Sequence, residues 1–416
     1  MGFEKDVRKL LERATKLNGF PLEKPKADFG DLAFPCFILA KDWKKAPPLI
    51  AEALVKDLRP KGRIEKITAA GPYINFFMKK GDFAKDVIHD IKRRGKEYGS
   101  SRKGNGKKLL IEHTSINPNA SPHVGRARNA IIGDSIARIM AFQGYKVDRH
   151  FFVNDIGKQI ALLVLGASQK PSFDKLLSIY IKANEELKAH PEKEKEVFAL
   201  LHQLENSNVS VRKKFREIVD ICVKGQEAIL NDFGITYDAF DYESDYLFSK
   251  DTDKVLKDLE KTGKIFVDDD KRKVLDLKDY KLPMKSPVFV LTRGDGTSLY
   301  GLRDIAYNLM KIKMANKNIV VLGEDQKLYH QQIIAALDLL GKKAPESIHY
   351  SFILLSDGKM STRKGNVVLL EDFMKEAKHK ARLEIKKRGY SDNIDENARS
   401  IGYGAVKYAI LKVSPD

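Results

Sequence analysis

Two kinds of apolar periodicity alternate in the first 100 residues of the chain. Helical spacing of apolar residues marks segments 7–14 and 49–58, whereas 64–67 and 73–77 are short runs of strand type. The next segment, 95–108, is crowded with Gly, Ser and Lys, which is typical of a linker. The pattern therefore predicts a small α/β domain over residues 1–100.

A second pattern covers residues 101–395, where short apolar strands alternate with amphipathic helices. Segment 109–112 is one such strand, and 319–322 is another that opens onto a loop at Gly323. This alternation is typical of a parallel sheet with helices on its faces, and such sheets bind ligands at the carboxyl ends of their strands. We expect an α/β fold with a Rossmann-type parallel sheet, preceded by the small α/β domain.

Strongly charged helical sequence interrupts this alternation between residues 172 and 234. Pro191 and the run 206–208 break the helical pattern, because proline and asparagine disfavour helix interiors. We therefore expect a helical insertion over about 165–240 that bridges the two halves of the nucleotide-binding fold.

The segment that follows strand 109–112 is the most informative one in the chain. It is rich in Pro and Asn, so it leaves the strand, and helical spacing of Ile resumes over 131–139. His123 and Gly125 lie at the start of that helix. Gly125 would let a nucleotide approach the backbone closely, and a helix N-terminus favours phosphate. A His-x-Gly triplet by itself is more often an ordinary turn.

A second loop, 359–366, lies between the apolar run 352–355 and a helical pattern that starts near residue 367. Its three cations, Lys359 among them, suit a clamp that closes on a triphosphate and neutralises charge on the leaving pyrophosphate. A lysine-rich loop alone is usually a solvated surface. The two loops together, in this order, favour activation of a carboxylate by ATP.

Residues that suit a guanidinium ligand occur further along the chain. A guanidinium group has five donors and no acceptor, so a selective site needs carboxylates, amide oxygens and an aromatic face. Glu243, Tyr300, Asp304 and Gln326 supply these groups. Tyr300 and Asp304 are four residues apart at a predicted helix start, hence on one face. Taken singly, Asp304 is equally well explained as an ordinary helix-end carboxylate.

The two loops resemble the HIGH and KMSKS signatures of class I aminoacyl-tRNA synthetases, and the whole chain resembles arginyl-tRNA synthetases of the archaeal and eukaryotic type. Further segments that carry the resemblance are 29–33, 71–77, 153–159, 242–245, 294–307 and 321–326. The resemblance implies an arginine–tRNA ligase that forms arginyl-adenylate from L-arginine and ATP and transfers the arginyl group to tRNA(Arg). It implies Mg²⁺ bound mainly by the ATP phosphates, with no metal site built by the protein itself.

The resemblance also implies roles for individual residues. Those expected in catalysis are His123, Arg126 and Lys359. Those expected to bind ATP are the same three together with Gly125, Gly323, Met360 and Ser361. Those expected to bind arginine are Asn117, Glu243, Tyr300, Asp304 and Gln326.

The resemblance further implies that the N-terminal domain grips the elbow of tRNA, where bases are splayed from the stack. Tyr73, Asn75 and Phe77 are expected to contact these bases, because exposed rings stack on unpaired bases and an amide can read a base edge. The alternative is that Tyr73 and Phe77 pack in the core of the domain, as alternating strand residues often do.

Two departures from the family pattern bear on activity. Arg126 stands where the signature has a second His, and Ala120 stands where the family usually has Lys. A guanidinium is a permanent, forked phosphate binder, so we expect Arg126 to replace the missing cation. If the two changes instead remove activity, the chain would be an RNA-binding or regulatory module, or an adenylate-forming enzyme with another acceptor.

The end of the chain, 396–416, resembles the start of a helical anticodon-binding domain. Three explanations are open, namely a trimmed chain, one half of a split enzyme, or a free-standing paralogue. In the split enzyme, a separate helical polypeptide supplies the rest of that domain. It would dock on an exposed apolar face of the last helix that includes Val406, Ile410 and Val413.

Composition narrows the class of protein. The 416 residues carry 75 Lys and Arg against 57 Asp and Glu, a net charge of +18 that favours a polyanionic partner such as RNA. A generally basic proteome or a thermophile's surface is the alternative explanation of that charge. Cys36 and Cys222 are far apart and lack His neighbours at ligand spacing, so no disulfide framework or zinc site is expected. No apolar run approaches membrane-spanning length, and we expect a cytoplasmic protein.

Overall fold

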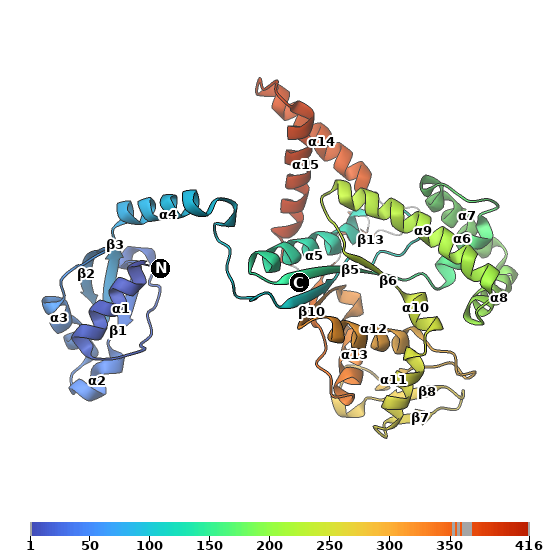
Figure 1. The fold of residues 1–416 in the computed structure, drawn as a ribbon, viewed down its shortest axis with the longest axis horizontal. Coiled ribbons are helices and arrows are strands. Elements are labelled where there is room, and N and C mark those ends of the chain that lie inside the picture. Colours follow the sequence, from blue (N-terminus) through green and yellow to red (C-terminus); the bar gives the residue numbers. More distant parts are fainter. Residues whose placement is uncertain (1, 352–353, 356–357, 360–367, 415–416) are drawn as a thin grey trace. The chain divides into compact units, whose positions relative to one another are not determined.

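The computed structural model describes residues 2–351, 354–355, 358–359 and 368–414 (Figure 1). The chain divides into two compact units, residues 1–99 and residues 100–416. Each unit has its own hydrophobic core.

The N-terminal unit is a three-stranded antiparallel sheet covered by helices. The order of its strands is β1-β3-β2, so β3 is central and pairs on both sides. Ile74 and Phe76 of β3 enter the core, where they meet Phe3, Val7 and Leu11 of the first helix. The elements are α1 (Gly2–Thr15), β1 (Leu32–Pro35), α2 (Phe37–Trp43), α3 (Pro47–Asp57), β2 (Ile64–Ala70), β3 (Tyr73–Met78) and α4 (Lys80–Arg94).

A five-stranded parallel sheet forms the centre of the second unit, as the alternating pattern predicts. The strand order is β11-β10-β4-β5-β6, so the chain starts in the middle of the sheet, runs to one edge and then returns to fill the other side. The order therefore reverses between β4 and β10, and parallel sheets bind ligands at the carboxyl ends of strands at such a point. The strands are β4 (Lys108–Glu112), β5 (Lys146–Val153), β6 (Ala239–Tyr242), β10 (Lys317–Gly323) and β11 (Glu346–Tyr350).

Helix α5 (Val124–Phe142) connects β4 to β5 and packs closely against the end of β4. A Cβ atom at Gly133 would lie 2.3 Å from the Cβ of His113. Only glycine therefore allows the helix to approach the strand at this point, and the N-terminal turn of α5 is held beside the sheet edge.

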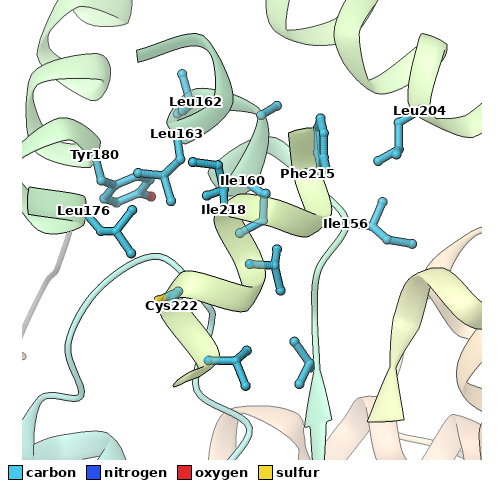
Figure 2. Close-up of a cluster of buried hydrophobic side chains, with 14 of the residues drawn as sticks. Ile156, Ile160, Leu162, Leu163, Leu176, Tyr180, Leu204, Phe215, Ile218 and Cys222 are labelled. Atoms are coloured by element: carbon cyan, nitrogen blue, oxygen red, sulfur yellow. The ribbon is translucent and has the colours of Figure 1, made fainter. Parts of the chain in front are cut away.

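The charged region between β5 and β6 is helical and breaks where the sequence predicts. It contains α6 (Lys158–Gly166), α7 (Leu176–Ala189), α8 (Glu194–Glu205) and α9 (Val209–Asp232). Pro191 lies between α7 and α8, and the Asn208 side chain caps α9 by accepting a hydrogen bond from the Val211 N–H at 3.2 Å. Figure 2 shows the apolar side chains that these helices bury against one another.

A second group of elements lies between β6 and the last strands of the parallel sheet. It includes an antiparallel sheet, β7-β8-β9, that the periodicity did not predict. Its strands are short and partly exposed, so they carry little apolar pattern. The elements are α10 (Glu243–Phe248), α11 (Asp251–Glu260), β7 (Ile265–Val267), β8 (Lys273–Asp276), β9 (Val288–Val290), α12 (Tyr300–Met314) and α13 (Lys327–Leu339).

Two long helices, α14 (Leu370–Lys387) and α15 (Ile394–Leu411), pack side by side and complete the unit (Figure 1). Val406 and Ile410 of α15 are only 5% and 8% exposed, because they pack in a cluster with Ile131 of α5. The expectation that these two residues form an exposed docking face is therefore wrong, while Val413 is exposed. Within the described ranges, no helix is long and apolar enough to cross a membrane.

Candidate active site

A cavity of about 320 Å³ opens at the carboxyl edge of the parallel sheet. Each strand contributes to its lining at or just after its last residue: Glu112 from β4, Asn154 after β5, Glu243 after β6, Gly323 from β10 and Tyr350 from β11. The topology therefore brings together groups that are as much as 238 residues apart, counting from Glu112 to Tyr350.

Seven of the residues that the sequence predicts for ATP and arginine line this one cavity. They are Asn117, Arg126, Glu243, Tyr300, Asp304, Gly323 and Gln326. His123 and Gly125 lie at the start of α5 but are not among the lining residues. Lys359 belongs to the short strand β13 (Gly358–Lys359), which pairs with β12 (Leu354–Leu355). Met360 and Ser361 lie outside the described residues.

The loop after β4 has a strained backbone that Asn129 holds in place. Thr114 and Ser115 have φ angles of 87° and 45°, in a region that non-glycine residues rarely adopt. The Oδ1 atom of Asn129, on α5, accepts from the Thr114 N–H at 2.5 Å, and its Nδ2 atom donates to the Val321 carbonyl of β10 at 2.8 Å. Asn129 thus joins the loop, α5 and β10, a role that residue spacing did not reveal.

Gln226 of α9 holds the next part of the same loop. Its Nε2 atom donates to the carbonyl oxygens of Asn117, at 3.0 Å, and Ala120, at 2.8 Å. Ala120 is only 2% exposed, so the loop encloses this residue. A lysine at this position would have to leave the protein interior or displace its neighbours.

His123 is the residue before the first turn of α5, and its ring is half-buried. The Nδ1 atom is enclosed and has no hydrogen-bond partner in the part of the chain that the structure describes. Burial, with a contribution from the charge of Arg126, lowers the pKa of His123 to about 4. The imidazole is therefore neutral at physiological pH, and it can act as a hydrogen-bond donor but not as a cation.

The first signature loop holds the end of the second one directly. The Val124 N–H donates to the Val368 carbonyl at 2.9 Å, and the Leu370 N–H donates to the Pro122 carbonyl at 2.8 Å. The Ser121 hydroxyl also donates to the Glu371 carboxylate at 2.9 Å. Residues 368–371 are therefore bound to the loop that precedes α5.

Arg128 of α5 contacts Ser351, the residue that precedes segment 352–367 with the second signature. Its buried guanidinium donates from Nη1 to the carbonyl of Ser351 and from Nη2 to the carbonyl of Ser414, the latter at 2.7 Å. The described residues on the two sides of this segment, Ser351 and Val368, are thus both hydrogen-bonded to helix α5. The sequence predicts that the two signature loops lie close together. The described residues on either side of the second loop do contact the first loop or helix α5.

Three carboxylates line the cavity, and two of them are already paired with cations. Glu112 accepts from the ammonium group of Lys311, and both side chains are buried. The Glu243 Oε1 atom accepts from Arg303 Nε at 2.8 Å, again with both side chains buried. The pairing of Glu243 was not expected from the sequence, since Glu243 was predicted to be available for an arginine ligand.

Asp304 is the third carboxylate and differs from the other two. It accepts from neutral groups, the Asn308 amide at 2.8 Å and the Tyr329 hydroxyl at 2.9 Å. Among the described residues, no cationic side chain forms an ion pair with it. Burial raises the pKa of Asp304 to about 6, and nearby Lys311 opposes that shift. The cavity therefore contains one partly buried carboxylate, Asp304, whose negative charge a bound cation would compensate.

Aromatic rings lie next to Asp304. The Tyr300 ring, which is largely exposed, lies 5.3 Å from the Tyr329 ring between centroids. Tyr329 in turn contacts Phe289 at 5.9 Å. A planar cation bound at Asp304 would meet an aromatic face as well as a carboxylate. Sequence reasoning found Tyr300 but missed several lining residues, namely Glu112, Asn129, Asn154, Lys311, Tyr329 and Tyr350.

The residues predicted to contact tRNA lie on one face of β3 in the N-terminal unit. Tyr73 and Phe77 are half-buried and are not part of the hydrophobic core, which takes Ile74 and Phe76 from the opposite face. Asn75 between them is only 3% exposed. Tyr73 packs edge-on against Phe37, with centroids 5.9 Å apart. The strand alternation thus separates the two aromatic rings from the core, whereas their role with RNA stays a prediction.

Comparisons with known proteins identify the family of the chain. Residues 88–414 match the family model described as the catalytic domain of class I tRNA synthetases (R), and residues 2–78 match the arginyl-tRNA synthetase N-terminal domain. The chain belongs to the class I arginyl-tRNA synthetases. An arginine–tRNA ligase of Methanocaldococcus jannaschii is 39% identical over 94% of this chain and 70% of its own length. One of Methanocella arvoryzae is 39% identical over 91% of this chain and 69% of its own length.

Solved structures show the same fold. The arginyl-tRNA synthetase of Thermus thermophilus is similar over 100% of this chain and 76% of its own, with a TM-score of 0.77 and 24% identity. That of Plasmodium falciparum gives a TM-score of 0.72 at 17% identity. The α/β fold, the family and the enzyme class, arginine–tRNA ligase, are therefore confirmed, and with them the use of ATP. The roles of individual residues in this arginyl-tRNA synthetase are proposals.

Proposed function

We propose that this chain activates L-arginine with ATP in the cavity at the sheet edge and transfers the arginyl group to tRNA(Arg). The observation that carries the proposal is Asp304, a partly buried carboxylate with neutral partners in a cavity that also presents Tyr300 and Gln326. The guanidinium group of arginine binds Asp304 through charge-assisted hydrogen bonds and lies against the ring of Tyr300. Asn117, in the loop after β4, also lines the cavity and holds the end of the ligand that carries the amino and carboxylate groups.

Arg126 and the N-terminal turn of α5 provide the ATP side of the cavity. Arg126 lines the cavity and interacts with Tyr350 by charge and hydrogen bonding. Its permanent charge faces the phosphates, and Gly323 allows the nucleotide to pack against the end of β10. Gly125 and neutral His123 belong to the same turn, where helix N–H groups favour phosphate. Lys359 adds a further cation from the second signature loop.

The reaction that these positions support has two steps. An oxygen of the arginine carboxylate attacks the α-phosphorus of ATP. A bond forms between that oxygen and the α-phosphorus, and the bond between the α-phosphorus and the oxygen of the leaving pyrophosphate breaks. A ribose hydroxyl at the 3′ end of tRNA then attacks the activated carbonyl, loses its proton and displaces AMP. The protein contributes alignment and charge neutralisation, without a covalent nucleophile.

Mg²⁺ fits this arrangement as a companion of the nucleotide. In the ranges that the structure describes, no group of three or more His, Cys, Asp or Glu side chains is placed to hold a metal ion. Mg²⁺ usually keeps few protein ligands and binds substrate phosphates, whose charge it neutralises. Arg126 and the helix N-terminus would bind the phosphate oxygens beside it. The separate helical polypeptide and the cytoplasmic location stay predictions.

Two assays test the proposed function. The first measures arginine-dependent exchange of pyrophosphate into ATP, with and without a tRNA(Arg) transcript. The second measures charging of that transcript with arginine. Exchange and charging are the expected results. Exchange without charging would favour an adenylate-forming enzyme with another acceptor. Binding of RNA with neither reaction would favour a regulatory module instead.

We expect Arg128→Met to raise the KM for ATP about tenfold in that assay, because the charge-assisted hydrogen bond to Ser351, next to the second signature loop, is lost together with the one to Ser414. The KM for arginine should stay unchanged, since Arg128 does not line the cavity. Arg138→Met is the matched control, because Arg138 lies on the same helix, its side chain is exposed, and it contacts the Asp134 carboxylate and the Gly234 carbonyl rather than the second signature loop. Equal losses for ATP and arginine would indicate general damage and contradict the anchoring role.

A further inference from the structure

The two oxygens of the Asp304 carboxylate are held separately by two neutral groups. Asn308, one turn further along α12, donates from Nδ2 to Oδ1 at 2.8 Å, and the Tyr329 hydroxyl of α13 donates to Oδ2 at 2.9 Å. Both Asn308 and Tyr329 line the cavity at the sheet edge. The carboxylate is therefore bound from two helices, and rotating it would break at least one of these hydrogen bonds.

The amide of Asn308 has one favourable orientation in this environment. Its Nδ2 atom faces two acceptors of Asp304, the carboxylate Oδ1 and the backbone carbonyl, the latter at 2.9 Å. An amide turned the other way would place its oxygen against both of them. The remaining atom, Asn308 Oδ1, is enclosed and has no hydrogen-bond partner in the described parts of the chain. Because a buried carbonyl without a partner destabilises a fold, the contact with Asp304 explains this asparagine better than packing does.

Aromatic packing fixes the ring of Tyr329. Its centroid lies 5.9 Å from that of Phe289 on β9 and 5.3 Å from that of Tyr300 on α12. Phe289 is buried, and its ring fits against the start of α12 because residue 301 is glycine. A Cβ atom on Gly301 would lie 2.5 Å from Phe289 Cζ. The Tyr329 hydroxyl thus reaches Asp304 from a ring that is held on two sides.

The hydrogen bonds leave capacity on both oxygens of the carboxylate. An ionised carboxylate accepts about four hydrogen bonds, two on each oxygen. Among the described residues, Asp304 receives one hydrogen bond on each oxygen and forms no ion pair. One acceptor site thus stays open on Oδ1 and one on Oδ2. Two open sites on neighbouring oxygens match two parallel N–H groups of a guanidinium, whereas an ammonium group donates from a single atom.

The charges around the site do not supply this selectivity by themselves. Glu112 is paired with Lys311, and Glu243 is paired with Arg303. A guanidinium and an ammonium carry the same charge, so both would meet the same uncompensated carboxylate at Asp304. Coulombic attraction therefore separates the two cations poorly, and the arrangement of the acceptors has to make the difference.

We propose that Asn308 and Tyr329 are positioning residues that hold the Asp304 carboxylate with one open acceptor site on each oxygen, so that the cavity selects a forked, planar cation over an ammonium group such as that of lysine. The proposal deepens the proposed function and rests on it, since that function places the guanidinium of arginine at Asp304. Both residues act through Asp304 and take no part in the reaction.

Calorimetric titration of the full chain with L-arginine, and displacement of bound arginine by L-lysine, test the proposal. The two amino acids share their amino and carboxylate ends, so the ratio of their dissociation constants isolates the side-chain cation. Tyr329→Phe and Asn308→Leu should each weaken arginine binding about tenfold, the scale of one hydrogen bond to a charged group, and lysine binding by about twofold at most. The selectivity for arginine should therefore fall about fivefold.

Stability distinguishes a positioning role from a purely structural one. Asn308→Leu replaces an amide whose oxygen has no partner in the described chain by an apolar side chain of similar volume. Its melting temperature should stay within about 2 °C of wild type although arginine binding weakens. If the melting temperature falls further, Tyr329→Phe supplies the deciding ratio.

Two substitutions outside the cavity are matched controls. Asn184→Leu removes an amide that donates at 2.7 Å to the carbonyl four residues earlier, as Asn308 does. Tyr280→Phe removes a hydroxyl that donates at 2.7 Å to a carboxylate, as that of Tyr329 does. Both controls should keep the wild-type selectivity.

The pH profile of arginine binding adds a readout that packing alone would not change. The Tyr329 hydroxyl stabilises the ionised form of Asp304 and so lowers its pKa, against the larger, opposite effect of burial. Lys311 also lowers this pKa, and Glu112 and Glu243 raise it, but the substitution leaves all three in place. In Tyr329→Phe the pKa should rise, so arginine binding should weaken at a higher pH than in wild type.

Three results would overturn the inference: unchanged affinity for arginine in both variants, equal loss of affinity for arginine and lysine, or an unmoved pH profile in Tyr329→Phe. Failure of the proposed function gives a different pattern. If the variants lose selectivity as expected while wild type gives no pyrophosphate exchange, the positioning of Asp304 stands and the ligase function fails. If wild type exchanges pyrophosphate and charges tRNA(Arg) while both variants bind like wild type, the inference fails and the ligase function stands.

Discussion

Asp304→Asn is expected to lower kcat/KM for arginine by about a thousandfold in pyrophosphate exchange, because a buried guanidinium would lose its charged partner. The other two carboxylates of the cavity cannot replace it without giving up Lys311 or Arg303. The KM for ATP should change little, since Asp304 contacts Asn308 and Tyr329 on the arginine side. Exchange measured over a range of arginine concentrations at saturating ATP gives the result.

Asp338→Asn is a close control for this substitution. Asp338 also accepts from a tyrosine hydroxyl, that of Tyr280 at 2.7 Å, but it lies outside the cavity. This variant should keep the wild-type kinetics. An unchanged KM for arginine in Asp304→Asn would show that the guanidinium binds elsewhere, and the assignment of the cavity would have to be abandoned.

The pH dependence of arginine binding gives a second view of the same residue. Burial raises the pKa of Asp304 to about 6, whereas the guanidinium ligand binds the ionised carboxylate. The KM for arginine should therefore rise as pH falls through 6, approaching about tenfold per pH unit at lower pH. The ligand lowers the pKa when it binds, so arginine uptake releases protons in this range. Asp304→Asn should remove that part of the pH profile.

Arg126→Ala is expected to reduce the rate of pyrophosphate exchange by about a hundredfold, the usual effect of losing one preorganised group that stabilises a transition state. Arg126 lines the cavity, and the half-buried His123 next to it is neutral, with a pKa of about 4. The turn therefore has one permanent cation. The rate of pyrophosphate exchange at saturating ATP and arginine measures this loss.

Arg126→His restores the second histidine of the family signature and should recover part of the rate. The control Arg138→Ala removes a guanidinium from the surface of the same helix, where it pairs with Asp134. An Arg126→Ala variant as active as wild type would refute the idea that Arg126 compensates for the altered signature. Adding Ala120→Lys should lower the melting temperature, because residue 120 is buried and its carbonyl is bound by Gln226.

The helices and strands that frame the site could be predicted because their signals are local. The apolar run 109–112, the loop rich in Pro and Asn, and the helical spacing after residue 131 lie next to one another in the sequence. Asn208 and Pro191 mark helix boundaries through hydrogen bonding and backbone geometry of their own. The short, half-exposed strands β7 to β9 lack such a signal and were missed.

The partners of the predicted site residues could not be read in the same way. Glu243 is paired with Arg303, 60 residues away, and Glu112 with Lys311, 199 residues away. A carboxylate in the sequence has the same chemical character whether it binds a ligand or an internal cation. Only the spatial neighbours show which role a carboxylate has. Glu112 and Glu243 have cationic partners, whereas Asp304 accepts from neutral groups and is therefore the carboxylate that we propose for the guanidinium.

By itself, the sequence determined the α/β class, the positions of the two signature loops and the family, since these depend on periodicity and on residue types at short spacing. The tertiary structure decided which residues share the cavity, which charges stay uncompensated and which face of α15 is buried. It also revealed that Asn129, Gln226 and Arg128 hold the loops. These features depend on contacts between distant segments, whose energies are set by burial and distance rather than by neighbouring residues in the chain.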